Sequence, residues 1–221
     1  MKIFPSLLAA DQLRIAEKIK ALEPHCDGFH IDIMDDHFVD NMAFGPGFVA
    51  AVREFTRESI AAHLMVEEPE KWIARLDLAP CDRFVFHWEA TGKTRIKPLV
   101  EKVRAKNWNI GLAVNPGTSV NEFEQFVPDF DLIVLMGVEP GFSGQKFVDS
   151  VTVKISELDS LRKKLNLSFA IAVDGGVKKD NIVHLMNLGA EFFPVGSAIF
   201  GAPDHVEALR ELYAQEERVA Y

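Results

Sequence analysis

Short apolar runs alternate with longer stretches of helical periodicity from one end of the chain to the other. Runs of four to eight residues rich in Val, Ile and Phe are typical of buried strands, whereas apolar residues three and four positions apart are typical of helices. The runs predict strands at residues 2–6, 28–33, 60–65, 83–87, 110–114, 132–136, 169–173 and 192–195. The periodic segments predict helices at residues 11–22, 47–55, 68–78, 95–106, 120–126, 148–165, 180–188 and 204–216.

Eight strands that alternate with helices within 221 residues predict an α/β fold of the (β/α)8 type, the TIM barrel. A doubly wound open sheet is the alternative. No Gly/Ser-rich linker or change of composition divides the chain, so we expect a single barrel domain that spans residues 1–221.

Composition narrows the class of protein. The chain is 48% hydrophobic and 26% charged, which is ordinary for a soluble globular protein. Its net charge of −9 argues against nucleic acid or an anionic membrane as a partner. No apolar run approaches the roughly 20 residues of a membrane helix, and the first residues do not resemble a signal peptide. We therefore expect a cytoplasmic protein in which Cys26 and Cys81, which lack a metal-type spacing, are free thiols.

Side chains of the kinds that bind metals end three of the predicted strands. His30 and Asp32 lie two residues apart in the second strand, so they point to the same face about 7 Å apart. His63 lies near the end of the third strand and Asp174 at the end of the seventh. Because the active site of such a barrel forms at the carboxyl ends of its strands, we expect these side chains to meet. The alternative is that each is a hydrogen-bonded polar group near the core.

Two imidazoles and two carboxylates suit zinc, iron(II), manganese or cobalt, and the set does not choose among them. The sequence therefore predicts one divalent metal ion at the mouth of the barrel.

Glycine-rich segments follow the sixth, seventh and eighth predicted strands. Glycine lets backbone amides approach a ligand closely, and the loops after the last two strands of a barrel are a frequent phosphate site. Helix N-termini at these loops add positive potential. Each segment alone is also compatible with a simple turn. Together they predict a phosphate cradle that includes Gly141, Phe142, Ser143, Gly144, Gly175, Gly176, Gly196 and Ser197.

Methionines lie at or just after three of the predicted strand ends, at Met34, Met65 and Met136. Core filling is the ordinary role of methionine, but at this position the three side chains also predict an apolar cap over a reacting centre. The histidines at positions 25, 87, 184 and 205 are assigned no role, although His87 ends the fourth predicted strand.

Several short motifs follow one another along the chain, and their order and spacing together are specific to one protein family. They are Pro5-Ser6-Leu7-Leu8, His30-Ile31-Asp32-Ile33-Met34-Asp35, His37-Phe38-Val39, His63-Leu64-Met65-Val66, Phe86-His87 with Glu89-Ala90, Pro140-Gly141-Phe142 with Gly144-Gln145-Lys146-Phe147, Val173-Asp174-Gly175-Gly176-Val177 and Gly196-Ser197-Ala198-Ile199-Phe200. With these motifs the chain resembles the ribulose-phosphate 3-epimerase family over nearly its whole length.

The resemblance implies a barrel that binds one divalent metal ion through His30, Asp32, His63 and Asp174. It implies that Asp32 and Asp174 are the two acid/base groups, that Ser6 touches the substrate and that the glycine loops hold its phosphate. The expected reaction is the 3-epimerisation of a sugar phosphate through an enediolate, interconverting ribulose 5-phosphate and xylulose 5-phosphate. We expect the protein to be a homo-oligomer.

Other functions remain open at this point. An epimerase for a hexulose 6-phosphate such as allulose 6-phosphate would use the same chemistry with a longer pocket. A sugar-phosphate or nucleotide decarboxylase would need a lysine among the acids at the strand ends, and the Asp-x-Lys pattern is absent after the third strand. A phosphate-binding barrel without catalytic activity is disfavoured by the intact set of two histidines and two aspartates.

The sequence also departs from the family pattern. Asp36 stands where glycine is usual, Asp40 where proline is usual, and Ser143 where glycine is usual. Gly137 replaces a small hydroxyl residue, and Pro194 removes a backbone donor from the last strand. None of these departures touches the four expected ligands.

Overall fold

The computed structural model describes residues 1–80 and 82–219. Cys26 is half-buried and forms no disulfide within this part of the chain. The prediction of a free thiol at Cys81 falls outside the described residues.

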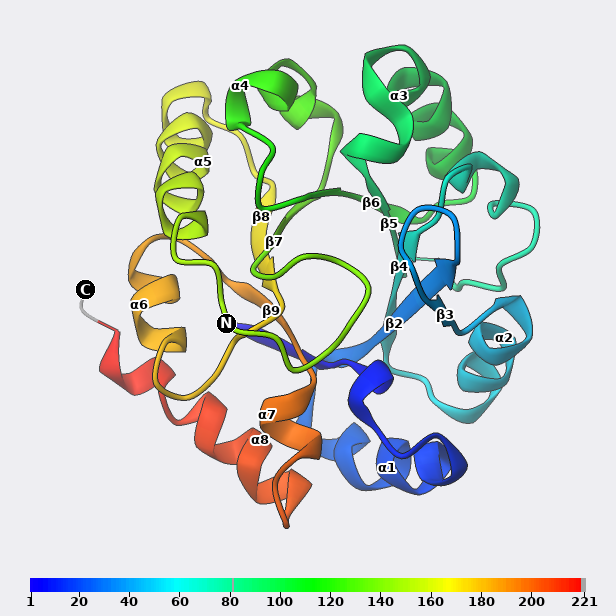
Figure 1. The fold of residues 1–221 in the computed structure, drawn as a ribbon, viewed down its shortest axis with the longest axis vertical. Helices are drawn as coiled ribbons and strands as arrows, with labels where there is room; N and C mark the ends of the chain where they lie inside the picture. Colours follow the sequence, from blue (N-terminus) through cyan, green and yellow to red (C-terminus); the bar gives the residue numbers. More distant parts are fainter. Residues whose placement is uncertain (81, 220–221) are drawn as a thin grey trace.

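A closed ring of eight parallel strands forms the centre of the molecule and confirms the predicted (β/α)8 barrel (Figure 1). The hydrogen-bonded order is β1-β9-β8-β7-β6-β5-β4-β2, and a parallel bridge between Ser6 and His30 joins β1 to β2. A short ninth strand, β3, pairs antiparallel with the end of β2. The strands are β1 Lys2–Pro5, β2 Gly28–Asp35, β3 Met42–Ala43, β4 Ser59–Met65, β5 Arg83–His87, β6 Asn109–Val114, β7 Leu132–Met136, β8 Ala170–Asp174 and β9 Phe192–Val195.

Helices surround the strands on the outside of the ring (Figure 1). They are α1 Ile15–Leu22, α2 Pro46–Phe55, α3 Trp88–Arg104, α4 Val120–Phe123, α5 Val151–Leu165, α6 Ile182–Asn187, α7 Ser197–Phe200 and α8 His205–Tyr213. The connection from β7 to α5 crosses the centre of the view in Figure 1, over the open end of the ring. No helix of the described residues is both long and apolar enough to cross a bilayer.

The helix predicted at residues 68–78 is wrong. The structure has only the 3-10 turn Pro69–Lys71 there, followed by turns in which the carbonyl oxygen of Trp72 accepts from the backbone N–H of Arg75 and of Leu76. The apolar residues whose spacing suggested a helix are buried without one. After the turns the chain is extended, and Leu78 is buried in the core. The short helix α7 and the strand β3 were not predicted, because two to four residues carry too little periodicity.

Side chains alternate between the interior of the ring and the layer beneath the helices. On β2, Phe29, Ile31 and Ile33 pack outward into the large core shared with the helices. The ring interior below the mouth is filled by a separate cluster of small and large apolar side chains, as is usual for this fold. These interior residues are Phe4, Ala61, Val85, Ala113, Leu132, Val134, Met136, Ala172 and Phe192.

At the amino end of the ring, an aspartate precedes each of β2, β5 and β7. The carboxylate of Asp82 accepts the N–H of Ile60 on the neighbouring β4 at 2.8 Å and pairs with Arg53 at 2.9 Å. Asp27 and Asp131 repeat the arrangement. Asp27 accepts from Ile3 at 3.0 Å and from the Tyr213 hydroxyl, and Asp131 accepts from Ile110 at 2.8 Å and from Arg104 at 2.9 Å. Each carboxylate thus ties its own strand to the neighbouring one.

Candidate active site

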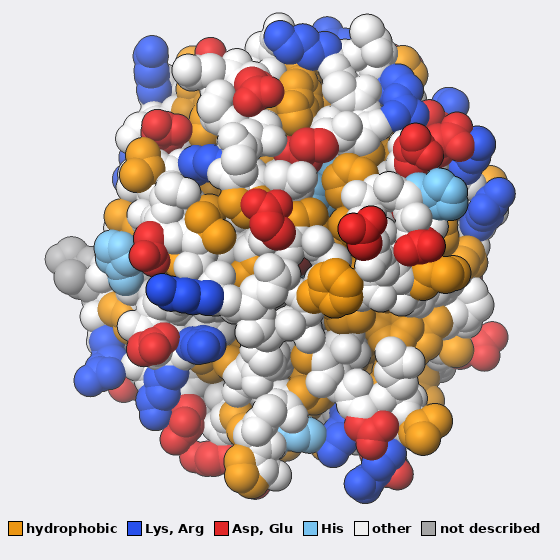
Figure 2. All heavy atoms as spheres, viewed as in Figure 1, with side chains coloured by type: hydrophobic (Ala, Val, Ile, Leu, Met, Phe, Trp, Pro, Cys, Tyr) orange, Lys and Arg blue, Asp and Glu red, His pale blue; other side chains and the backbone are white. Residues whose placement is uncertain are grey.

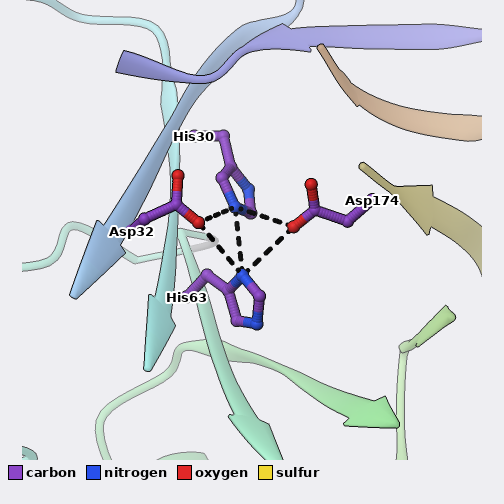
Figure 3. Close-up of side chains that lie close together, drawn as sticks. All are labelled: His30, Asp32, His63 and Asp174. Atoms are coloured by element: carbon purple, nitrogen blue, oxygen red, sulfur yellow. Dashed lines mark hydrogen bonds and ion pairs between the residues drawn. The ribbon is translucent and has the colours of Figure 1, made fainter. Parts of the chain in front are cut away.

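Four inward-pointing side chains meet just below the mouth of the ring. His30 and Asp32 lie on β2, His63 on β4 and Asp174 at the end of β8, and all four are buried. The strand register brings them together, since Asp32 pairs with His63 across β2 and β4. Figure 3 shows the two imidazoles and the two carboxylates pointing toward one point. The structure therefore brings together the four side chains selected from the sequence as metal ligands.

The distances between these side chains match the spacing of ligands around one small cation. His30 Nε2 lies 3.1 Å from Asp32 Oδ1, 3.2 Å from Asp174 Oδ2 and 3.2 Å from His63 Nδ1. His63 Nδ1 lies 3.3 Å from Asp32 Oδ1 and 3.1 Å from Asp174 Oδ2. Ligands held about 2.0–2.2 Å from a common ion lie roughly 3–3.5 Å apart.

Hydrogen bonds alone do not satisfy this group of atoms. An imidazole nitrogen carries at most one proton, directed at one acceptor, whereas each of these two nitrogens faces three atoms with lone pairs. Within the described chain, Asp174 Oδ2 is buried without a properly directed hydrogen bond. One divalent cation accepts lone pairs from all four atoms and offsets the charge of both carboxylates. The donor set of this site therefore fits a divalent metal ion.

The electrostatics of the four residues are strongly coupled. Burial by itself lowers the pKa of His30, but the charges of Asp32 and Asp174 outweigh it and raise that pKa to about 10. Burial by itself raises the pKa of both carboxyl groups, but His30 outweighs it and holds each pKa below its ordinary value. The centre thus keeps its carboxylates ionised and attracts positive charge, whether from a proton or from a metal ion.

A second hydrogen-bonded chain begins on the far side of His63. His63 Nε2 lies 2.8 Å from His87 Nε2 at the end of β5, and His87 Nδ1 lies 3.4 Å from Glu89 Oε2 in the first turn of α3. Glu89 Oε1 accepts from the backbone N–H of Asn115 at 2.9 Å and from the Thr118 hydroxyl. His87 was assigned no role from the sequence, in which its only signal is a histidine at a strand end two residues before a glutamate.

The centre opens into a pocket at the mouth of the ring, with about 560 Å³ of empty space including the part open to solvent. Besides Asp32 and Asp174, its lining includes every residue that the sequence analysis selected for substrate binding: Ser6, Met34, Met65, Met136, Gly141, Phe142, Ser143, Gly144, Gly175, Gly176, Gly196 and Ser197. Leu8 and Val138 also line it and were not selected.

Both polar and apolar side chains line this pocket next to the centre. The Ser6 hydroxyl donates to Asp32 Oδ2 at 2.8 Å. Met34 and Met65, which are register partners on β2 and β4, are buried beside the centre. In Figure 2 the basic side chains lie mainly toward the rim of this face, whereas acidic and hydrophobic side chains also lie near its middle. A ligand phosphate at the mouth would therefore depend on backbone donors rather than on a basic patch.

Backbone conformation explains two of the glycines. Gly175 has φ +96° and Gly176 has φ +69°, which L side chains rarely adopt. A Cβ on Gly175 would lie 2.4 Å from Val138 Cγ2, so no side chain fits there. Asp36 also has positive φ, 58°, a conformation that Asp and Asn adopt more readily than most residues other than glycine.

Taken together, the closed ring and the buried centre at the carboxyl ends of its strands define a (β/α)8-barrel enzyme. Comparison with known families is more specific, since residues 2–200 match the model of the ribulose-phosphate 3 epimerase family. The chain belongs to this family of carbohydrate isomerases.

Curated relatives cover almost the whole chain. The ribulose-phosphate 3-epimerase of Bacillus subtilis is 37% identical over 96% of this chain and 98% of its own length. The Synechocystis enzyme of the same name is 36% identical over 94% of this chain and 90% of its own length. The chloroplastic ribulose-5-phosphate-3-epimerase of Arabidopsis thaliana is 34% identical over 99% of this chain and 78% of its own length.

Solved structures support the fold. The structure of KGPDC from Streptococcus mutans superposes with a TM-score of 0.70 at 13% identity, covering 100% of this chain and 99% of that one. Orotidine 5'-monophosphate decarboxylase from Sulfolobus solfataricus gives a TM-score of 0.67 at 18% identity, covering 99% of both chains. At these identities the likeness concerns the barrel architecture alone.

Proposed function

We propose that this protein interconverts D-ribulose 5-phosphate and D-xylulose 5-phosphate by moving the proton at C3. The observation that carries the proposal is that Asp32 and Asp174 reach one buried centre, and one pocket, from β2 and β8. These strands are separated in the ring by β9 and β1, so the two carboxyl groups can flank a bound ligand. The curated relatives carry the name of this reaction.

Inversion at C3 requires that one group removes a proton from one face of the substrate while another supplies a proton to the opposite face. The reacting form has one of the pair protonated and the other ionised, and a cation shared between them would keep both groups able to titrate near neutrality. One of Asp32 and Asp174 then accepts the C3 proton and the other donates its own, and the roles reverse in the opposite direction. Each positioned acid or base typically contributes about 10²–10⁴-fold to the rate.

His30 and His63 would hold the metal ion together with the two aspartates. When bound, a divalent ion (Zn, Fe(II), Mn or Co) supplies electrostatic stabilisation for the negative charge that develops on the substrate oxygens. The Ser6 hydroxyl fixes the orientation of the Asp32 carboxyl through its hydrogen bond to Oδ2. The buried methionine side chains exclude water from the face on which the proton moves.

The substrate phosphate would bind where the loops after β7, β8 and β9 meet. The hydrogen bonds of α7 begin with Ile199 and Phe200, both donating to Gly196, so the N–H groups of Ser197 and Ala198 precede the first intrahelical bond. The left-handed backbone at Gly175 and Gly176 brings further main-chain groups to the same rim. Charge-assisted hydrogen bonds to the phosphate contribute about 1.5–3 kcal/mol each. Several of them would supply binding energy far from C3 that positions the reacting carbon.

Turnover of ketose phosphates, measured with metal content on the same sample, tests the proposal. We expect the highest kcat/KM with ribulose 5-phosphate, a lower value with allulose 6-phosphate and a value lower by orders of magnitude with free ribulose. A chelator should abolish activity, and one of the four metals should restore it. Equal kcat/KM for phosphorylated and free ketoses, or full activity in metal-free protein, would contradict the proposal.

Two variants separate the parts of the site. His63→Ala should lose bound metal and activity together. Ser197→Asp places a carboxylate at the proposed phosphate position and should lower kcat/KM by orders of magnitude while metal content stays unchanged. A homo-oligomeric state and a cytoplasmic location stay predictions, which sedimentation velocity and fractionation of cells measure directly.

A further inference from the structure

The two imidazoles of the centre are held in different ways. His63 directs Nδ1 to the centre, and its Nε2 lies 2.8 Å from His87 Nε2. His30 directs Nε2 to the centre, and within the described residues its buried Nδ1 has no hydrogen-bond partner. Of these two imidazoles, only that of His63 is connected, within residues 1–80 and 82–219, to a further side chain that can fix its tautomer.

The direction of the hydrogen bonds along this connection follows from its far end. Glu89 is anchored because its Oε1 accepts from the Asn115 N–H and the Thr118 hydroxyl. Its other oxygen, Oε2, is an acceptor that faces His87 Nδ1 at 3.4 Å, so the proton of a neutral His87 belongs on Nδ1. His87 Nε2 then has a free lone pair and accepts the proton of His63 Nε2. His63 Nδ1 is left with its lone pair directed at the centre.

The packing around the connection restricts other arrangements. Both imidazoles are fully buried, and their rings are stacked with centroids 5.0 Å apart and planes inclined by 14°. Phe38, from the segment after β2, also packs against the His87 ring, with a centroid distance of 4.8 Å and planes inclined by 49°. The loop that anchors Glu89 is itself held by Lys154, which donates to the carbonyl oxygens of Asn115 and Pro116.

We propose that His87 and Glu89 are positioning residues that fix His63 as a metal ligand by holding the proton on its Nε2 atom. The proposal rests on the metal centre proposed above. Partners that hydrogen-bond to a metal-ligating histidine orient the ring and select its tautomer, and their loss typically weakens metal affinity about 10–100-fold. The described residues offer no equivalent partner for His30 Nδ1, so the expected effect concerns His63 alone of the two imidazoles.

The test is Co²⁺ binding to the metal-free full-length protein, measured as a dissociation constant by competition with a chromogenic chelator and as the visible absorption of the bound ion. His87→Leu, which removes the acceptor, should raise the dissociation constant about 10–100-fold and change the absorption band. His87→Gln, whose side-chain oxygen can again accept from His63, should restore most of the affinity. Rescue by His87→Gln would not occur if His87 acted only through packing.

A matched control lies one helical turn away. The Thr91 hydroxyl donates to the carbonyl oxygens of His87 and Trp88 but takes no part in the connection to His63, so Thr91→Val should keep the affinity of the unmodified protein. Glu89→Ala provides a second measurement if His87→Leu fails to fold, and it should also weaken Co²⁺ binding.

Two results would overturn the inference while leaving the proposed function intact. One is a Co²⁺ affinity and spectrum of His87→Leu, or of Glu89→Ala if that variant is needed, equal to those of the unmodified protein. The other is an equal rise of the Co²⁺ dissociation constant in His87→Leu and in His87→Gln. If the unmodified protein binds no Co²⁺, the proposed metal centre fails, and this inference fails with it.

Discussion

Buried carboxylates at the two ends of the barrel differ in whether the chain itself supplies all of their partners. At the amino end, Asp82 is paired with Arg53 and accepts the N–H groups of Ile60 and Ala79, so its charge is compensated within the chain. At the carboxyl end, Asp32 and Asp174 face two imidazoles that they share, and one oxygen of Asp174 is left without a directed hydrogen bond. The first arrangement is complete by itself, whereas the second has the donor set that a cation would complete.

The carboxylates of the amino end therefore concern the stability of the fold, and those of the carboxyl end concern its function. A carboxylate with all of its partners present stabilises the fold, and removing it leaves buried donors without acceptors. A buried carboxylate whose partners the chain does not fully supply can still bind a metal ion or move a proton. Substitutions at the two ends should therefore change different measured quantities.

The largest effect is expected from Asp174→Asn. This change removes one of the two proposed acid/base groups and one proposed metal ligand, so kcat/KM for ribulose 5-phosphate should fall by at least about 10²–10⁴-fold. Activity is measured by following product formation with a coupled assay at saturating metal. The matched control is Asp131→Asn at the amino end, which should leave kcat/KM within about twofold. Wild-type turnover by Asp174→Asn would mean that the two-carboxylate reaction is wrong.

The next effect is on stability and comes from Asp82→Ala. This change leaves the largely buried Arg53 guanidinium without its carboxylate, together with two backbone N–H groups. Breaking a buried pair in this way costs about 3–5 kcal/mol in the free energy of unfolding, measured by urea denaturation. The folded variant should keep its kcat/KM. Asp77→Ala, an exposed aspartate of the same connection, should change the unfolding free energy by less than about 0.5 kcal/mol.

The smallest effect concerns alkaline pH and Tyr213. Burial, with the Asp27 carboxylate in second place, raises the pKa of the Tyr213 hydroxyl above its ordinary value of 10.0. The unfolded chain loses this proton near pH 10 while the folded chain retains it. The contribution of Tyr213 to stability is therefore complete below pH 10 and is lost as pH rises above it.

Unfolding of the unmodified protein and of Tyr213→Phe, measured from pH 8 to pH 11, isolates this contribution. The two stability curves should run parallel up to about pH 10, and the unmodified protein should lose more stability above it. Curves that stay parallel over the whole range would show that Tyr213 does not titrate differently in the two states.

Strand positions could be predicted well because each strand is a short, continuous apolar run. The bounds of β5, β7 and β9 agree with the prediction at every residue. Helices were harder to predict where the chain interrupts its own periodicity. The segment labelled α3 begins at Trp88, but Gly92, in a non-helical conformation with φ 56°, separates its first turn from the regular helix that was predicted near residue 95.

The side chains of the centre could be selected from the sequence because each is a metal-binding type at a strand end. The connection through His87 and Glu89 could not, since its geometry depends on how the end of β5 turns into α3 and on where the loop after β6 lies. The aspartates of the amino end were missed for a similar reason. Their partners, Ile3, Ile60 and Ile110, lie on neighbouring strands and leave no local signature.

The four side chains of the centre stand on strands, whereas most of the pocket around them is lined by loops, above all the connection after β7 that crosses the mouth. Loops accept insertions and exchanges far more readily than strands of a closed ring do. Substitutions in residues 137–150 can therefore change the shape of the pocket while the four buried side chains on the strands stay the same. Selectivity and chemistry can evolve here at different speeds.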